Sequence, residues 1–319
     1  MLASRVMQII EHIGDRIFTD SEDAGEFLFR EGQYTPAQIN EGEWTPFGKD
    51  DMWGYREEYC WFKQTVTIPE RFAGKPVVYE ISPFSDSSWN NRAQQFIFFV
   101  NGKLVQGADR NHSYIYLTHC AKGGEVFDIA LNAYCDDWEF RGRTTLRASL
   151  KVKDEEVNAL YYDLLVPWET AHHYSHDDIE RIDIIKSLNT AVSMLEMNTC
   201  DDKVFHDSVK AVREYLKENV YGKDMGVVTS VIGHTHIDTA WLWRLRQTRE
   251  KAARSFASVV NLMREYPEYK FMSSQAQLYD FVKRDYPELY SEIKQLVAEK
   301  RWEPEGSMWV ESDTNVVSG

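Results

Sequence analysis

Cysteine is scarce in this sequence. The chain has four cysteines, which are Cys60, Cys120, Cys135 and Cys200. No two of them have the C-x-x-C spacing that is typical of redox and metal motifs. Disulfide-stapled secreted domains carry far more cysteine for their length. Nothing here indicates an oxidising compartment, so we expect reduced thiols in a cytoplasmic protein.

Basic clusters and long apolar runs are also missing. The chain has 36 Lys and Arg against 51 Asp and Glu, which gives a formal net charge of -15. Such a surface repels phosphate, so we expect no nucleic-acid or anionic-membrane partner, whereas a neutral ligand such as a sugar is compatible. No segment is long and apolar enough to span a membrane.

The first residues do not form a secretory signal peptide, because charged residues at Arg5, Glu11 and Asp15 interrupt the apolar run. The apolar residues recur instead at helical spacing: Leu2, Val6, Ile9, Ile10, Ile13 and Ile17. The pattern predicts an amphipathic helix within residues 1–20 that packs against its own protein.

Apolar and aromatic residues are abundant. They make up 43% and 13% of the 319 residues, which is enough for two ordinary cores, since single domains usually run to roughly 100–200 residues. We therefore predict a globular protein of more than one domain.

Short strands are predicted between residues 61 and 135, where β-branched and aromatic runs alternate with Pro, Gly, Asn and Asp. The runs are FKQTVTI, VVYEI, QFIFFV, YIYL and VFDIAL. They predict an antiparallel β-sandwich over residues 21–155. Asn101-Gly102 predicts a two-residue hairpin, because both central positions need positive φ. The segment resembles the galactose-binding-like jelly rolls appended to many glycosidases, with a WFKQTVTIP opening and a VNGKLVQG hairpin.

Tryptophans of this region have two interpretations. They could form a platform for sugar stacking, but an aromatic residue in a sandwich is more often part of the core. The four are Trp53, Trp61, Trp89 and Trp138. We assign no binding site to them.

Residues 156–224 are predicted to be a helical linker. The apolar period changes to 3.6 between Asp177 and Tyr221, which predicts two helices. Asn198-Thr199 and Asp201-Asp202 offer turn and cap residues between them, and Gly222 suits the position after the second helix.

The order of elements changes again in residues 225–319. VVTSVIG, YKFMSS and the RWEPEGSMWVES segment predict three strands, with a helix over 240–265 and another over 275–299 that breaks at Tyr286-Pro287. A β-α-β-α-β order predicts a parallel sheet or barrel with its site at the carboxyl ends of the strands. A barrel needs about eight strands, so we expect this β/α domain to be truncated here.

Metal-ligand residues follow the first of these strands directly, in His234-Thr235-His236-Ile237-Asp238. Residues two apart in an extended segment point the same way, so His236 and Asp238 can share a metal. The alternative is that Asp238 only caps the following helix. We favour a divalent metal, with zinc as the first choice and cobalt as the second.

Two motifs decide between the metallohydrolase families that use such a site. GHTHIDTAWLW, with His236, Asp238 and Trp241, and the later GSMWVESDTN, with Asp313, resemble the signatures of glycoside hydrolase family 38 α-mannosidases, of the cytosolic and bacterial type. The resemblance covers about residues 226–319 and makes the chain an N-terminal portion of such an enzyme.

The resemblance implies a retaining mechanism. Asp313 would be the catalytic nucleophile and, with His236 and Asp238, a metal ligand, while Trp241 would stack on the mannose of an α-mannoside or oligosaccharide. Trp241 could instead be a core residue on the first helix. His234 could be a hydrogen-bond partner of a metal ligand or only a polar residue at the end of the strand. Glu311 could orient a neighbouring side chain or face the solvent. No Asp or Glu before residue 319 matches the family's acid/base, so this portion alone is expected to be inactive.

Two other functions stay open at this point. An amidohydrolase-type metallohydrolase also uses an H-x-H pair after its first strand, and a non-catalytic carbohydrate-binding module would need only the sandwich. A homo-oligomer is also compatible with the sequence.

Overall fold

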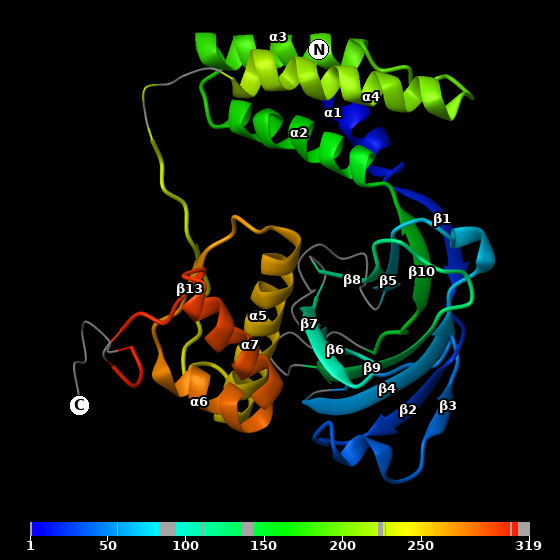
Figure 1. Ribbon diagram of the computed structural model, residues 1–319, viewed down its shortest axis with the longest axis vertical. Helices are drawn as coiled ribbons and strands as arrows, with labels where there is room; N and C mark the ends of the chain where they lie inside the picture. The colour runs from blue at the N-terminus through cyan, green and yellow to red at the C-terminus, as the bar shows by residue number, and fades with distance from the viewer. Residues whose placement is uncertain are drawn as a thin grey trace.

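The computed structural model of the chain describes residues 2–55, 57–82, 94–109, 112–135, 143–222, 226, 228–306 and 308–311. The chain forms three regions: two antiparallel sheets, a helical cluster made of segments before and after these sheets, and a small parallel sheet with its own helices (Figure 1). Three residues singled out in the sequence, Trp89, Trp138 and Asp313, lie outside the described residues.

The two antiparallel sheets share one core. The larger sheet has the order β3-β2-β4-β9-β6-β7, and the smaller has the order β1-β10-β5-β8. Their strands are β1 (Phe18–Asp23), β2 (Phe27–Glu31), β3 (Thr45–Phe47), β4 (Glu58–Thr67), β5 (Val77–Ile81), β6 (Gln94–Val100), β7 (Lys103–Ala108), β8 (Tyr114–Thr118), β9 (Val126–Cys135) and β10 (Ala148–Lys153). Short 3-10 turns, η1 (Gln38–Asn40) and η2 (Glu70–Phe72), lie between strands. Phe62 and Phe98 of the larger sheet and Tyr79 and Leu150 of the smaller belong to one buried cluster, so the sheets pack face to face.

The predicted hairpin is confirmed. Asn101 and Gly102 connect β6 to β7 with φ values of 50° and 78°, and Val100 pairs with Lys103 across the turn. The core interpretation is confirmed for the described tryptophans, because Trp53 and Trp61 are 0% and 1% exposed. Trp53 packs edge-on against Phe62, so no sugar platform exists at these two positions.

Four helices pack together at one end of the sandwich (Figure 1). They are α1 (Leu2–Gly14), α2 (Glu155–His172), α3 (Ile179–Ser193) and α4 (Asp202–Leu216), which continues as a π turn, η3 (Lys217–Tyr221). Val6, Ile10 and Ile13 of α1 are fully buried in this cluster, as the amphipathic pattern predicts. Asp201 caps α4, and Gly222 follows η3 as predicted, with a φ of -80°. No helix in the described part of the chain is long and apolar enough to cross a membrane.

The last region has the predicted β-α-β-α-β order. It consists of β11 (Gly233–His234), α5 (Leu245–Glu265), β12 (Phe271–Met272), α6 (Ala276–Asp285), α7 (Pro287–Ala298) and β13 (Trp302–Glu303). The three strands pair in parallel in the order β11-β12-β13. Pro287 occupies the first turn of α7, which confirms the predicted break between the two last helices.

Two predictions for this region are wrong. The strand expected over VVTSVIG is limited to Gly233 and His234, and Val228 and Val231 are 96% and 87% exposed, because no described segment pairs with them. The helix expected from residue 240 begins at Leu245, since Arg244 has an extended backbone and its N–H donates to the Gln247 side chain at 2.6 Å. Residues 239–243 are therefore a loop.

Helix α5 joins the parallel region to the sandwich, where it lies along β7 (Figure 1). The Gly107 N–H donates to Ser258 Oγ at 3.1 Å, and buried Gln247 donates to the Tyr134 hydroxyl at 2.6 Å. Ala253 of α5 also belongs to a buried cluster with Trp61 and Phe99 of the sandwich. The two regions are thus in direct packing contact.

Candidate active site at the carboxyl ends of β11, β12 and β13

Polar side chains gather where the three parallel strands end. His236 and Asp238 follow β11, Ser274 and Gln275 follow β12, and Glu311 follows β13. Because the carboxyl ends of parallel strands lie at one edge of a sheet, residues from three distant parts of the sequence meet there.

His236 lies between two carboxylates. Its Nε2 atom is 3.1 Å from Asp238 Oδ1, and its Nδ1 atom is 3.2 Å from Glu311 Oε2. The three side chains are 54%, 41% and 36% exposed, so solvent and small ligands can reach them. The structure therefore brings together His236 and Asp238, the two predicted ligands that it describes.

Glu311 has a defined position rather than a free solvent-facing one. Ser274 Oγ donates to Glu311 Oε1 at 2.7 Å, which leaves Oε2 directed at His236. Of the two roles considered for Glu311, the contacts favour the orienting one. His234 is exposed, and its described contact is the backbone pairing with Met272.

Gln275 is a site residue that the sequence analysis missed. It is 4% exposed, its Nε2 donates to the carbonyl of Ile237 at 2.7 Å, and its Oε1 accepts from Thr239 Oγ1 at 2.8 Å. Both bonds fix the loop that carries His236 and Asp238. The signal was available, since a polar Ser-Ser-Gln run directly follows the second predicted strand.

Trp241 lies in the loop before α5 and is 67% exposed, so its interpretation as a core residue of the first helix is wrong. The ring of Trp243 packs edge-on against it, with the ring centroids 5.6 Å apart. A second aromatic, Trp309, is 58% exposed and donates to Gln277 Oε1 at 2.8 Å. Exposed aromatic faces are thus present in the loops that follow β11 and β13.

The described donors suit a divalent metal as part of its ligand set. Among the described residues no three His, Cys, Asp or Glu side chains form a group able to hold a metal ion. His236 and Asp238 nevertheless offer one imidazole nitrogen and one carboxylate oxygen, which are the donor types that zinc prefers. The third predicted ligand, Asp313, follows Glu311 by two positions, outside the described residues.

The region that contains these residues is similar to known proteins. Residues 226–319 match the family model described as "Glycosyl hydrolases family 38 N-terminal domain". Alpha-mannosidase G of Dictyostelium discoideum is 29% identical over 279 residues, which cover 81% of this chain and 24% of that protein. Alpha-mannosidase 2C1 of Homo sapiens is 28% identical over 306 residues, covering 90% and 27%.

A third relative, Alpha-mannosidase of Saccharomyces cerevisiae, is 30% identical over an alignment of 330 positions, which covers 94% of this chain and 28% of that protein. The chain spans about a quarter of the length of the curated relatives it matches. On these matches, residues 226–319 are similar to the N-terminal domain of glycosyl hydrolase family 38, and most of the chain is similar to alpha-mannosidases.

Proposed function

We propose that the protein is a retaining α-mannosidase that hydrolyses α-mannosidic bonds of oligosaccharides. The observation that carries this proposal is the meeting of His236, Asp238 and Glu311 at the carboxyl edge of β11–β13, inside the region that matches family 38. The names of the relatives support the substrate class.

His236, Asp238 and Asp313 would hold a divalent metal, zinc or cobalt, at this edge. When bound, the metal would polarise the 2- and 3-hydroxyls of the reacting mannose. Glu311 Oε2 lies 3.2 Å from His236 Nδ1, where it would orient the imidazole ring for metal binding. Trp241 would offer its exposed face to the same sugar.

Asp313 is the proposed nucleophile. Its carboxylate attacks the anomeric carbon, the bond to the leaving oxygen breaks, and a covalent glycosyl-enzyme forms. A second carboxyl protonates the leaving oxygen and then takes a proton from the attacking water, so that the sugar keeps its configuration. We assign this acid/base to no residue among the 319.

The same proposal also divides the chain into domains. Residues 21–155 would form a galactose-binding-like jelly roll, preceded by the helix of residues 1–20 and followed by the linker of residues 156–224. Residues 225–319 would then begin a β/α barrel-like catalytic domain, of which β11–β13 are the first strands. A cytoplasmic location and a homo-oligomeric state stay predictions.

The test of the proposed function is to trap the glycosyl-enzyme. The full-length protein is incubated with a fluorinated mannosyl donor, digested, and the added sugar is located by mass spectrometry. We expect a label on the peptide that contains Asp313, and no label in Asp313→Ala, whose turnover should fall by a factor of at least about 10³. A label on another peptide, or inversion at the anomeric carbon seen by NMR, contradicts the mechanism.

A further inference from the structure

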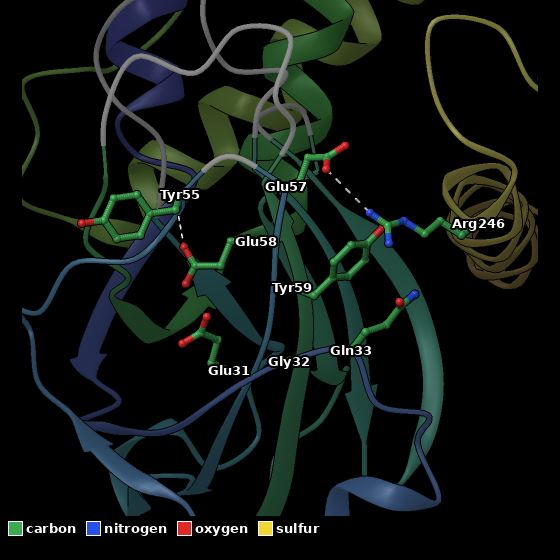
Figure 2. Close-up of a pocket in the computed structure, with 8 residues that line it drawn as sticks. All are labelled: Glu31, Gly32, Gln33, Tyr55, Glu57, Glu58, Tyr59 and Arg246. Carbon is green, nitrogen blue, oxygen red and sulfur yellow. Dashed lines mark hydrogen bonds and ion pairs between the residues drawn. The ribbon is translucent and has the colours of Figure 1, made fainter.

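A polar pocket lies where the sandwich meets the beginning of α5 (Figure 2). Its volume is about 340 Å³. The end of β2, the beginning of β4 and the first turn of α5 supply its lining, which includes Glu31, Gln33, Glu57, Glu58, Tyr59 and Arg246. The sandwich thus supplies most of the lining, and Arg246 of α5 completes it.

Two buried polar atoms in this lining have no well-formed hydrogen bond within the described part of the chain, the Tyr59 hydroxyl and Arg246 Nε. The polar neighbour of the Tyr59 hydroxyl is the carboxyl group of Glu250. Tyr59 is only 7% exposed, and its hydroxyl points toward Arg246 (Figure 2). Buried polar groups are bonded in more than about nine cases out of ten, so we expect both atoms to bond to water or to a ligand in the pocket.

The acidic side chains supply hydrogen-bond acceptors at fixed positions. Glu57 has a φ of 52°, a backbone conformation that residues other than glycine seldom adopt, and its carboxylate lies 3.0 Å from Arg244 and 4.0 Å from Arg246. Glu58 accepts from the Gly54 N–H at 3.0 Å. The exposed Glu31 side chain has no hydrogen bond or ion pair with any described residue, so its carboxylate is available to a ligand.

The charges of the lining restrict the class of ligand. Three carboxylates disfavour an anion, whereas Arg246, with Arg244 beside it, disfavours a simple cation. A neutral polyhydroxylated molecule is compatible with both the carboxylates and the arginines, because its hydroxyls can donate to Glu31 and accept from Tyr59 and Arg246.

The pocket is also close to the candidate active site along the chain. Arg246 is the second residue of α5, and α5 begins just after the loop of His236 and Asp238, at the carboxyl edge of β11. We propose that the pocket binds a sugar unit of an oligosaccharide substrate, separate from the mannose whose bond is cleaved. This inference rests on the proposed function and extends it to longer chains.

The experiment compares two substrates of the full-length enzyme, α-linked mannotriose and an aryl α-mannoside. In Tyr59→Phe and in Glu31→Gln, the ratio of kcat/KM for the triose to kcat/KM for the aryl mannoside should fall about fivefold or more. Glu31 is exposed, so Glu31→Gln tests the pocket even if Tyr59→Phe fails to fold. The matched controls, Tyr174→Phe and Glu43→Gln, change exposed residues outside the pocket and should keep the ratio of the parent.

A binding measurement separates this inference from the proposed function. The Kd for mannotriose is measured by calorimetry in an Asp313→Ala background, with and without the two pocket substitutions. If the parent cleaves neither substrate, the proposed function fails, and a Kd raised by Tyr59→Phe or Glu31→Gln still supports the pocket. An unchanged Kd and an unchanged kcat/KM ratio in both pocket variants overturn it.

Discussion

At the scale of single residues, His236 is defined by the two carboxylates that flank its ring. A neutral imidazole has one N–H and can donate to only one of them. The hydrogen bond of the ring is the one between Nε2 and Asp238, and Glu311 lies within ion-pair distance of Nδ1. A metal bound by both His236 and Asp238 would replace this hydrogen bond, and it stays a prediction.

Metal content tests this expectation. His236→Ala and Asp238→Ala each remove one proposed ligand, so bound metal measured by elemental analysis after dialysis should fall well below one ion per chain. Glu311→Gln keeps both ligands but loses the charged partner of Nδ1, and should weaken metal affinity by roughly 10–100-fold in a chelator competition. His176→Ala, a change at an exposed histidine of the helical cluster, is the control. Full metal retention in the first two variants would refute the assignment.

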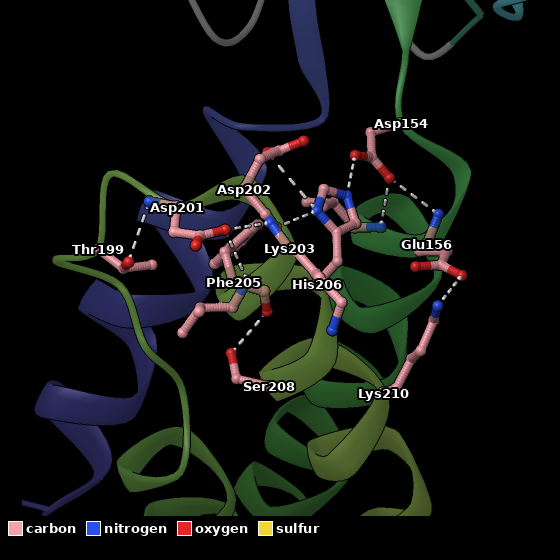
Figure 3. A network of polar contacts seen from close by, with 12 residues as sticks. Asp154, Glu156, Thr199, Asp201, Asp202, Lys203, Phe205, His206, Ser208 and Lys210 are labelled. Atoms are coloured by element: carbon pink, nitrogen blue, oxygen red, sulfur yellow. Dashed lines mark hydrogen bonds and ion pairs between the residues drawn. The ribbon is translucent and has the colours of Figure 1, made fainter.

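At the scale of elements, one histidine connects two helices (Figure 3). Asp154 caps α2 by accepting the N–H groups of Glu156 and Val157 at 3.0 Å, and its second oxygen lies 2.7 Å from His206 Nε2 on α4. His206 Nδ1 lies 2.9 Å from the carbonyl oxygen of Asp202. Both ring nitrogens face acceptors, so the protonated ring is favoured and the pKa of His206 is raised, chiefly by the Asp202 carbonyl and then by Asp154.

This raised pKa makes the junction pH-dependent. A histidine whose pKa is higher in the folded than in the unfolded chain stabilises the fold fully below about pH 6.5, the unfolded value, and the contribution disappears as pH rises through the folded value. His206→Gln should therefore lower the free energy of unfolding by about 0.5–1 kcal/mol at pH 5.5 and by less at pH 8.5. Urea titrations at the two pH values, with His176→Gln as control, check this. An equal loss at both values would contradict it.

At the scale of the whole molecule, the contact between α5 and β7 decides how the sandwich and the parallel region meet. Gly107 of β7 allows this contact, because a Cβ atom added there would lie 2.7 Å from the Cβ atom of Arg254. Burial lowers the pKa of Arg254, and it raises the pKa of Glu250 on the same helix face to about 7. A displaced α5 would disturb this charged pair as well as the proposed sugar pocket.

Gly107→Ala tests the importance of this contact. The new methyl group overpacks the interface and should cost about 1–3 kcal/mol of unfolding free energy, while the cleavage of the exposed segment 228–232 by a protease should become faster. Gly48→Ala is the control, because the nearest atom to its Cβ would be a carboxylate oxygen of flexible Glu26 at 3.4 Å. Unchanged stability and unchanged proteolysis would show that α5 docks without this close approach.

The sequence by itself determined the features that depend on near neighbours along the chain. The Asn101-Gly102 hairpin, the cap at Asp201 and the break before Pro287 each rest on the backbone preference of one or two residues. Residues two apart also meet as predicted, since His236 and Asp238 contact each other directly. Tertiary structure decided what depends on distant partners: the exposure of residues 228–232, the start of α5, the contact of Glu311 with His236, and the pocket between Tyr59 and Arg246. The apolar period of a sequence does not predict these features, because strand pairing, burial and ion pairing depend on which distant segment packs against a residue in the fold.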